Sequence, residues 1–229
     1  MERPRITLKL ATSMDGRIAL ANGESQWITS SDSRARVHRM RAEHDAILIG
    51  AGTLAADDPL LTARSVPLPA RQPVRLVADS RLRTPVHSRL VQSAGLGRVA
   101  LVCSDPTTRH ADAIKQAGAE VWQVTPDKRG RVSPSALLER CAVERLETVF
   151  LEGGGLLAAS FLRMGLVDKM YWFRAPIILG GDGIPAIGAM GLHQIQAAPR
   201  WRTAATERIG DDVLETYVRC KAATQGRHA

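Results

Sequence analysis

The chain has 229 residues, of which 45% are hydrophobic and 24% charged, and its formal net charge is +8. This composition is typical of a soluble globular protein and excludes intrinsic disorder and collagen-like repeats. The uncharged stretch over residues 46–56 is well short of the ~20 residues that a membrane-spanning helix needs. No export signal is recognised before residue 6, so we expect a cytoplasmic protein with no membrane partner.

The cysteine and histidine pattern gives no indication of a metal site. Cys103, Cys141 and Cys220 lie far apart and form no CxxC pair. Three buried thiols in a reducing compartment are therefore expected, rather than a disulfide framework or a zinc site. His38 and His44 are six residues apart, which is the wrong spacing for two ligands on one helical face. We predict no bound metal.

The basic residues are spread along the chain, and aromatic residues make up only 4% of it. Nucleic-acid-binding proteins usually cluster their cations and often interleave them with aromatic residues, so no nucleic-acid partner is expected. Arg34, Arg36, Arg39 and Arg41 lie on one predicted helix but point in several directions, so most are expected to be solvated. A cationic pocket for a small polyanion would give the same mild excess of charge.

Strand and helix signals alternate along the chain, with short breaks and no linker. Ser30 or Ser31 is predicted to cap a helix that ends near residue 43. Asp105 and Ser133 each precede a proline and are predicted to start further helices, the first of them closed by Gly118. The predicted strands are residues 6–12, 46–49, 74–79, 99–103, 120–124, 148–152 and 170–176.

This alternation predicts an α/β fold with a largely parallel sheet. The C-terminal part departs from the pattern, because residues 203–209 and 213–219 flank a Gly-Asp-Asp turn and predict an antiparallel hairpin. We therefore expect a mixed, mostly parallel sheet flanked by helices and completed by this hairpin, rather than a plain Rossmann domain.

The strongest local motif lies at residues 148–160, where an apolar strand runs into three glycines and then into a helical stretch. Glycines let the backbone approach a ligand closely, and the N-terminus of a helix favours anions, so the motif favours a pyrophosphate cradle. The motif matches neither named nucleotide-binding fingerprint, and a tight strand-to-helix turn remains the alternative. Glu152 stands where α/β proteins place their ligands, although it could instead bond to backbone N–H groups of the turn.

Two further segments end strands with polar loops. Lys9 interrupts the apolar first strand and points either to solvent or toward a ligand, while Trp27 is more typical of a core residue than of a cofactor contact. Asp57 and Asp58 could together bind a metal ion, but the side chains of adjacent residues point apart in an extended loop. Two other roles are therefore favoured: hydrogen bonds from these carboxylates to sugar hydroxyls, or termination of a helix before Pro59. Arg41 flanks an apolar helical stripe and could hold a phosphate bidentately.

No GxSxG motif, Cys–His pair or nucleophile beside a base is present, which indicates that a cofactor supplies the chemistry. In order and spacing, five segments resemble the reductase half of the bifunctional riboflavin-biosynthesis deaminase–reductase. The resemblance covers about residues 6–219, and the segments that carry it are residues 6–17, 23–30, 46–62, 152–155 and 175–181.

The resemblance implies a dihydrofolate-reductase-like fold, NADPH as hydride donor, and 5-amino-6-(5-phosphoribosylamino)uracil as the acceptor whose ribosyl group becomes ribityl. It also implies a homodimer. Lys9 and Glu152 are the catalytic candidates, and Arg81 or Arg83 is expected to bind the 2′-phosphate of the cofactor. The substrate contacts it implies are Ser25, Arg41, Leu61, Arg64 and Glu152. The NADPH contacts it implies are Ala11, Trp27, Thr53, Asp57, Ser80, Gly154, Gly155, Leu156, Leu157, Ala158, Ala159 and Ser160.

One departure from the resembled family concerns its deaminase half, which carries an HxE…PCxxC zinc signature that this chain lacks. We therefore expect residues 1–229 to form a single reductase domain, either alone or as a piece of a longer protein. Stand-alone members of the superfamily reduce the still-aminated 2,5-diamino pyrimidine, which remains an alternative acceptor. The sequence leaves two alternatives: a dihydrofolate- or pteridine-type reductase on the same fold, and a nucleotide- or nucleic-acid-binding module that has no catalytic activity. The poor clustering of basic with aromatic residues counts against nucleic-acid binding.

Overall fold

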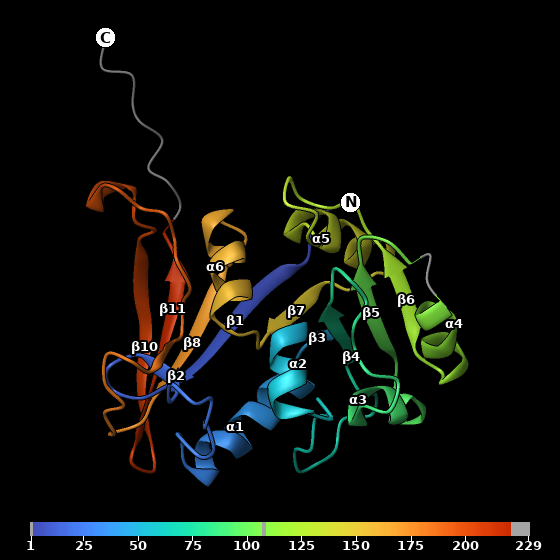
Figure 1. Cartoon of the computed structure of the whole chain (residues 1–229). Helices are drawn as coiled ribbons and strands as arrows, with labels where there is room; N and C mark the ends of the chain where they lie inside the picture. Colours follow the sequence, from blue (N-terminus) through green and yellow to red (C-terminus); the bar gives the residue numbers. More distant parts are fainter. Residues whose placement is uncertain (1, 107–108, 221–229) are drawn as a thin grey trace.

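A nine-stranded sheet forms the centre of the computed structural model, which describes residues 2–106 and 109–220. The strands of this sheet are β1 (Arg5–Thr12), β3 (Ala46–Gly50), β4 (Val74–Ala78), β5 (Val99–Cys103), β6 (Glu120–Gln123), β7 (Thr148–Leu151), β8 (Lys169–Arg174), β10 (Trp201–Ile209) and β11 (Asp212–Arg219). Their order is β10-β11-β8-β1-β7-β3-β4-β5-β6, and Figure 1 shows them as one twisted layer with the hairpin at an edge.

Neighbouring strands from β8 to β6 all run parallel, whereas β11 pairs antiparallel with both β8 and β10. The mixed, mostly parallel sheet and the C-terminal hairpin expected from the sequence are both confirmed. The seven other predicted strands are also present, each within two residues of its predicted bounds. Because parallel strands share one direction, the carboxyl ends of β1, β3, β4 and β7 meet at the same edge of the sheet.

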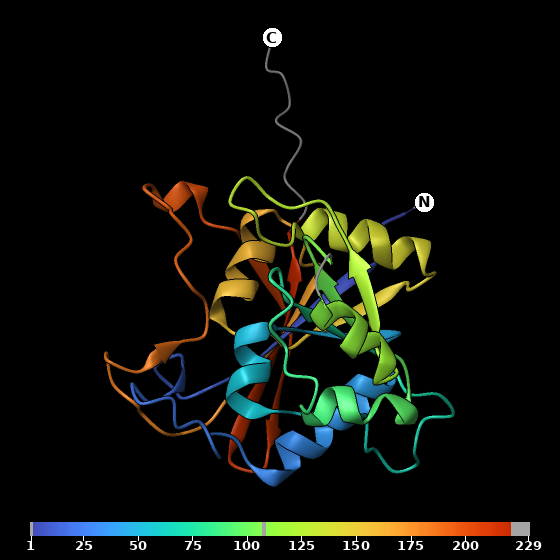
Figure 2. The same ribbon diagram turned by 45° about the vertical axis from the view of Figure 1, so that its right-hand side comes forward.

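Helices cover both faces of the sheet. They are α1 (Ser31–Ala42), α2 (Ala51–Asp57), α3 (Arg89–Gln92), α4 (Arg109–Gln116), α5 (Pro134–Val143) and α6 (Gly155–Arg163), with 3-10 turns at Ala94–Leu96 and Ile195–Ala197. Figures 1 and 2 show α5 and α6 on one side of the sheet and α1, α3 and α4 on the other.

The central strands are buried on both faces, which is why they read as continuous apolar runs. In β3, Ala46 and Leu48 pack in the cluster beneath α5 and α6, whereas Ile47 and Ile49 pack in the cluster with α3 and α4. Each fully buried aliphatic side chain of this kind contributes about 1.5–3 kcal/mol. The two clusters together hold the strand ends in fixed positions.

The predicted helix boundaries are partly confirmed. Ser30 caps α1 by accepting a hydrogen bond from Ser33 N, Ser133 precedes the proline that begins α5, and Gly118 follows α4 with φ of 90°. Pro106, expected to be the first residue of a helix after Asp105, is not helical. Helix α4 is described from Arg109 onward, and residues 107 and 108 lie outside the described residues.

Three features differ from the predictions or were left open by them. The extended loop after residue 50 is instead helix α2, because Leu54 packs into the core, while the helix end offered as one alternative for Asp57 and Asp58 is confirmed, since α2 ends at Asp57 and Asp58 has a left-handed conformation. Strands β2 (Arg17–Ala19) and β9 (Ile184–Pro185) form a small separate antiparallel sheet. Cys103 and Cys141 are buried as expected, but the expectation of a buried Cys220 is wrong, since this residue follows the end of β11 and is exposed.

Candidate functional site

Two adjoining cavities lie at the carboxyl ends of the parallel strands. One, of about 800 Å³, is lined by the glycine segments at residues 50–52 and 153–155 and is called the glycine cavity. The other, of about 690 Å³, is lined by Arg34, Arg41, Arg64 and Arg89 and is called the arginine cavity. The residues that line both are Lys9, Ala11, Ile18, Ser25, Thr53, Asp57 and Glu152. Ligands in the two cavities would therefore meet beside Lys9 and Glu152.

The glycine cavity is built around the turn that joins β7 to α6. Gly154 is the N-cap residue of α6 and supplies no side chain to the helix end, while its own N–H donates to Thr53 Oγ1 over 3.0 Å. A Cβ on Gly153 would lie 2.8 Å from the Leu157 side chain, and one on Gly154 would lie 3.2 Å from Thr53 Oγ1. Glycine is therefore required to keep the cradle open, and the helix N-terminus favours a diphosphate there.

An ion pair between Arg41 and Glu152 lies where the two cavities adjoin. Arg41 donates from Nε to Glu152 Oε1 over 2.5 Å and from Nη2 to Oε2 over 3.0 Å, and its Nη1 donates to Thr62 O. Lys9 Nζ lies 4.0 Å from Glu152 Oε2. The side chains of Lys9, Arg41 and Glu152 are only 18%, 13% and 8% exposed, so their interactions are weakly screened.

Burial and neighbouring charge shift the pKa values of this group. Burial lowers the pKa of Lys9, and the positive charge of Arg41 lowers it further, although Glu152 and Asp57 oppose both effects. Burial alone would raise the pKa of Glu152, but attraction and hydrogen bonds from Arg41 outweigh it, so the pKa falls. Burial raises the pKa of Asp57, against the charge of Lys9. Glu152 is thus an anion at neutral pH, and Lys9 releases its proton more easily than an exposed lysine.

The arginine cavity contains a cluster of cations. Arg64 Nη1 donates to Thr62 Oγ1, and the pKa of Arg64 is lowered by burial and by the charges of Arg41 and Arg89. His38 Nδ1 accepts a hydrogen bond from Arg64 N over 3.3 Å. Burial and the charges of Arg41 and Arg64 lower the pKa of His38 to about 4, so the imidazole is neutral at neutral pH. This concentration of positive charge favours a phosphate group.

Trp27 lies at the rim of the arginine cavity. Its side chain is 68% exposed, and the guanidinium of Arg34 lies 4.3 Å from the centre of its ring. The interpretation of Trp27 as a core residue is therefore wrong, because the residue sits in the loop before α1 and packs against a cation instead of the sheet.

The structure brings most of the predicted site residues together. All five predicted substrate contacts line the arginine cavity, and Trp27, Thr53 and Glu152, which come from three distant segments, line it as well. Of the predicted cofactor contacts, those that line the glycine cavity are Ala11, Thr53, Asp57, Ser80, Gly154, Gly155, Leu156, Leu157 and Ser160. Arg81 and Arg83 line it too.

Three predicted cofactor contacts do not line the glycine cavity, and of these Trp27 lines the arginine cavity instead. Ala158 and Ala159 line neither cavity and are 0% and 1% exposed, because the first turn of α6 directs them into the core beneath the helix. Their role as cofactor contacts, implied by the resemblance, stays a prediction that these buried side chains do not support. Two edges of the Arg41 guanidinium are occupied by Glu152 and by Thr62 O, so the bidentate grip of Arg41 on a phosphate stays a prediction that these contacts do not support.

Sequence reasoning missed several residues of the site. Arg34, His38 and Arg41 are spaced by four and three residues, which places them on one helical face, and this signal could have found His38. Arg89 comes from the short helix α3, for which no sequence signal was recognised. Asp127 and Arg131, from the loop after β6, also line the glycine cavity.

Within the ranges that the structure describes, no group of three or more His, Cys, Asp and Glu side chains is arranged to hold a metal ion. Over the same ranges, none of the helices combines the length and the apolar character required to traverse a lipid bilayer.

Similarity to known proteins extends over nearly the whole chain. A relative from Actinobacillus pleuropneumoniae, named riboflavin biosynthesis protein RibD, is 36% identical over 219 residues, covering 95% of this chain and 57% of that protein. A relative from Methanothermobacter thermautotrophicus is named 2,5-diamino-6-ribosylamino-4(3H)-pyrimidinone 5′-phosphate reductase. It is 36% identical over 217 residues, covering 94% of this chain and 98% of that protein.

The fold is also similar to solved structures. RibD from Acinetobacter baumannii superimposes with a TM-score of 0.82 at 27% identity, covering 96% of this chain and 59% of the solved chain. The chain thus spans a little under three fifths of the length of the RibD relatives that it matches. The family model described as the RibD C-terminal domain matches residues 4–214. The chain therefore belongs to the family of RibD C-terminal domains.

Proposed function

We propose that this protein is a reductase of riboflavin biosynthesis that uses NADPH to reduce the ribosyl group of 5-amino-6-(5-phosphoribosylamino)uracil to a ribityl group. The observation that carries the proposal is the junction of the two cavities at Lys9 and Glu152. A dinucleotide in one cavity and a phosphorylated sugar in the other would place their reacting ends at this junction.

The glycine cavity fits the dinucleotide. The open cradle at Gly153 and Gly154 and the N-terminus of α6 suit its diphosphate, with Thr53 holding the turn in place. β1 and β4 are three strand positions apart in the sheet, about 14 Å, and both contribute to the cavity. This span matches an extended dinucleotide that reaches from Lys9 on β1 to Ser80 beyond β4.

The arginine cavity fits the phosphorylated sugar. Arg64, Arg34 and Arg89 line it, and they are the arginines there that are not paired with a carboxylate among the described residues. We therefore assign the 5′-phosphate to this group, while Arg41 instead fixes the carboxylate of Glu152. Glu152 faces the junction and is available to accept hydrogen bonds from sugar hydroxyls.

NADPH, when bound, supplies a hydride to C1 of the ring-opened, imine form of the sugar. The imine nitrogen must then take a proton to give the amine. Lys9 suits this role, because burial lowers its pKa and its ammonium lies at the junction. Glu152 does not suit this role, because its lowered pKa keeps the carboxylate ionised at neutral pH. The carboxylate instead stabilises the positive charge of the neighbouring Lys9. Holding the two reactants together supplies several further kcal/mol.

A second acceptor is favoured by one relative. The Methanothermobacter protein, of which this chain covers 98%, carries the name of a reductase of the 2,5-diamino pyrimidinone. NADPH oxidation is therefore followed by absorbance with the uracil compound, its diamino precursor and dihydrofolate in parallel. We expect rapid oxidation with one or both ribosylaminopyrimidines and none with dihydrofolate. Oxidation with dihydrofolate alone would contradict the proposal and favour a pteridine-type reductase.

We further propose that residues 1–229 act as a single reductase domain in the cytoplasm and assemble as a homodimer. Strand β10 supports the dimer, because residues 202–208 of this edge strand are exposed over their whole length. Exposed edge strands of this length are usually covered, since they pair readily with other chains. Light scattering of the purified protein tests the dimer, and a monomeric mass at micromolar concentration would contradict it.

A further inference from the structure

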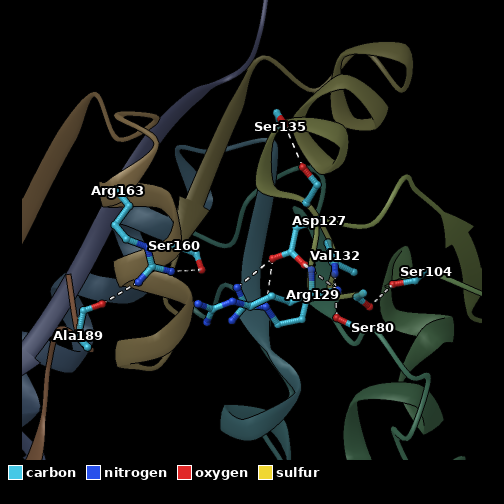
Figure 3. Close-up of polar contacts among 12 residues, drawn as sticks. Ser80, Ser104, Asp127, Arg129, Val132, Ser135, Ser160, Arg163 and Ala189 are labelled. Atoms are coloured by element: carbon cyan, nitrogen blue, oxygen red, sulfur yellow. Dashed lines mark hydrogen bonds and ion pairs between the residues drawn. The ribbon is translucent and has the colours of Figure 1, made fainter. Parts of the chain in front are cut away.

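A short basic loop after β6 forms one wall of the glycine cavity. Pro126 and Val132 pair across its base, and the loop between them turns at Gly130, whose φ is 71°. Asp127, Arg131 and Val132 line the cavity together with Ser80 and Ser160. In Figure 3, Asp127 and Arg129 lie between Ser80 on one side and Ser160 of α6 on the other.

The loop is tied to the ends of two strands. Ser80 Oγ, beyond β4, accepts a hydrogen bond from Val132 N over 2.8 Å. Ser104, beyond β5, donates from its Oγ to Gly130 O over 3.1 Å, and its N–H donates to Ser80 O. These contacts, three of whose residues are labelled in Figure 3, fix the loop against the sheet. The side chains on the loop therefore have a defined position relative to the cavity.

The carboxylate of Asp127 is fully used within the loop. Oδ1 accepts from Arg129 N over 2.8 Å and from Arg131 N over 3.0 Å, while Oδ2 accepts from Arg131 Nε and Nη2 over 3.1 and 2.9 Å. A carboxylate that selects NADH must accept a hydrogen bond from the free ribose 2′-hydroxyl. Asp127 is instead committed to presenting the guanidinium of Arg131.

Positive charge predominates around this loop. Arg81 and Arg83 line the same cavity, and Lys128 and Arg129 lie in the loop itself. Together with Asp127 and Arg131 these residues carry a net charge of +4. Among the described residues, no carboxylate forms an ion pair with Arg81, Arg83, Lys128 or Arg129. Such a site favours a phosphate dianion over a hydroxyl group.

The position of the loop identifies the part of the ligand that it would contact. The residues shared by both cavities, such as Lys9, lie at the end where the sugar would react, whereas the loop lines only the glycine cavity. β6 is the outermost strand on the opposite side of the sheet from the hairpin. The loop therefore faces the end of the dinucleotide that is remote from the nicotinamide, which is the adenine ribose.

We propose that the loop over residues 126–132 is the element that selects NADPH over NADH, with Arg131 binding the 2′-phosphate of the adenine ribose beside Arg81 and Arg83. Arg131 would do so through Nη1, since its guanidinium donates to Asp127 through Nε and Nη2. Asp127 acts as a positioning residue for Arg131, and Ser80 anchors the loop. The proposal rests on the proposed function only in that the glycine cavity holds a dinucleotide.

Binding of fragments tests the proposal without turnover. Titration calorimetry of the full chain compares adenosine 2′,5′-bisphosphate with adenosine 5′-monophosphate, which differs from it only in lacking the 2′-phosphate. We expect the wild type to prefer the 2′-phosphorylated fragment by roughly 100-fold, since charge-assisted hydrogen bonds are the strong ones. Arg131→Gln is expected to reduce this preference at least tenfold and to leave binding of the 5′-monophosphate unchanged. Arg208→Gln, in an exposed pair with Asp211 on the hairpin, is the matched control.

A second variant distinguishes two roles of the Asp127 carboxylate, namely positioning Arg131 and repelling the phosphate. If Asp127 positions Arg131, Asp127→Asn weakens binding of the 2′-phosphorylated fragment, because Arg131 loses its fixed orientation. Tighter binding by Asp127→Asn would show that the carboxylate only repels phosphate, and it would overturn the assigned role. Equal binding of both fragments by the wild type, or an undiminished preference in Arg131→Gln, would overturn the inference while the proposed function stands. If neither fragment nor NADPH binds, the proposed function itself fails.

Discussion

Replacing Glu152 by glutamine separates the charge of this residue from its shape. The carboxylate is 8% exposed, accepts two hydrogen bonds from Arg41 and lies 4.0 Å from Lys9 Nζ. At that distance and an effective dielectric constant of about 20, the attraction between Lys9 and Glu152 amounts to about 4 kcal/mol. The amide keeps one acceptor oxygen and part of the dipole, so we expect a loss of about 3 kcal/mol in transition-state stabilisation. Turnover should therefore fall roughly 100-fold.

The affinity for NADPH should change far less, because the cradle at Gly154 and α6 does not depend on the carboxylate. We expect the NADPH Kd, measured by fluorescence titration, to change by less than about threefold. Glu120→Gln is the matched control, since Glu120 also forms a bidentate pair, with Arg98, but lies outside both cavities. A Glu152→Gln variant with wild-type turnover, or with NADPH affinity reduced as much as turnover, would refute this reasoning.

Three further predictions concern other parts of the structure. Thr53→Val removes the acceptor for Gly154 N, and we expect the NADPH Kd to rise roughly tenfold in fluorescence titration; an unchanged Kd would contradict the role of the cradle. Between pH 6.5 and about 4, unfolded chains bind a proton at His38 that the folded chain does not, so the free energy of unfolding falls as the pH falls. Urea titrations should give a flatter pH dependence for His38→Gln than for the wild type, and identical slopes would be inconsistent with a neutral His38. Arg75 is 0% exposed and donates hydrogen bonds to Leu60 O, Gly97 O and both oxygens of Ser93. We expect Arg75→Met to lower the free energy of unfolding, measured by urea titration, by about 3–5 kcal/mol. A decrease below ~1 kcal/mol would exclude this structural role.

The sheet was the part of the fold most accessible from the sequence. Strands such as β3 and β5 are short apolar runs between polar breaks, and the Gly-Asp-Asp turn between β10 and β11 marks a hairpin directly. Of helix α2 only the end at Asp57 and Asp58 was offered, as one alternative, because its seven residues contain one buried side chain and no polar cap. The β2–β9 sheet joins segments that lie more than 160 residues apart, and such pairing leaves no local pattern.

The sequence indicated which residues would lie in the site, but not which of them would form hydrogen bonds and ion pairs with one another. The strand ends indicated where Lys9, Thr53 and Glu152 would meet, because parallel strands share one edge. The bidentate pair of Arg41 with Glu152 depends on how α1 packs against β7, across more than 100 residues of sequence. A phosphate-binding role for Arg41 was therefore as consistent with the sequence as the ion pair. The position of His38 could have been found from its spacing with Arg34 and Arg41 on one helical face, but its lowered pKa could not, since that pKa depends on burial and on charges from other segments.

If a nicotinamide and a phosphorylated ribosylaminopyrimidine react at the junction of the two cavities, the hydride passes directly from one to the other. NADPH carrying two deuterium atoms at C4 of the nicotinamide, so that either face delivers deuterium, is turned over with each ribosylaminopyrimidine, and the product is analysed by NMR and mass spectrometry. We expect one deuterium at C1 of the ribityl chain. A reduced product without deuterium at C1 would contradict direct transfer at this junction, and so would the absence of any reduced sugar.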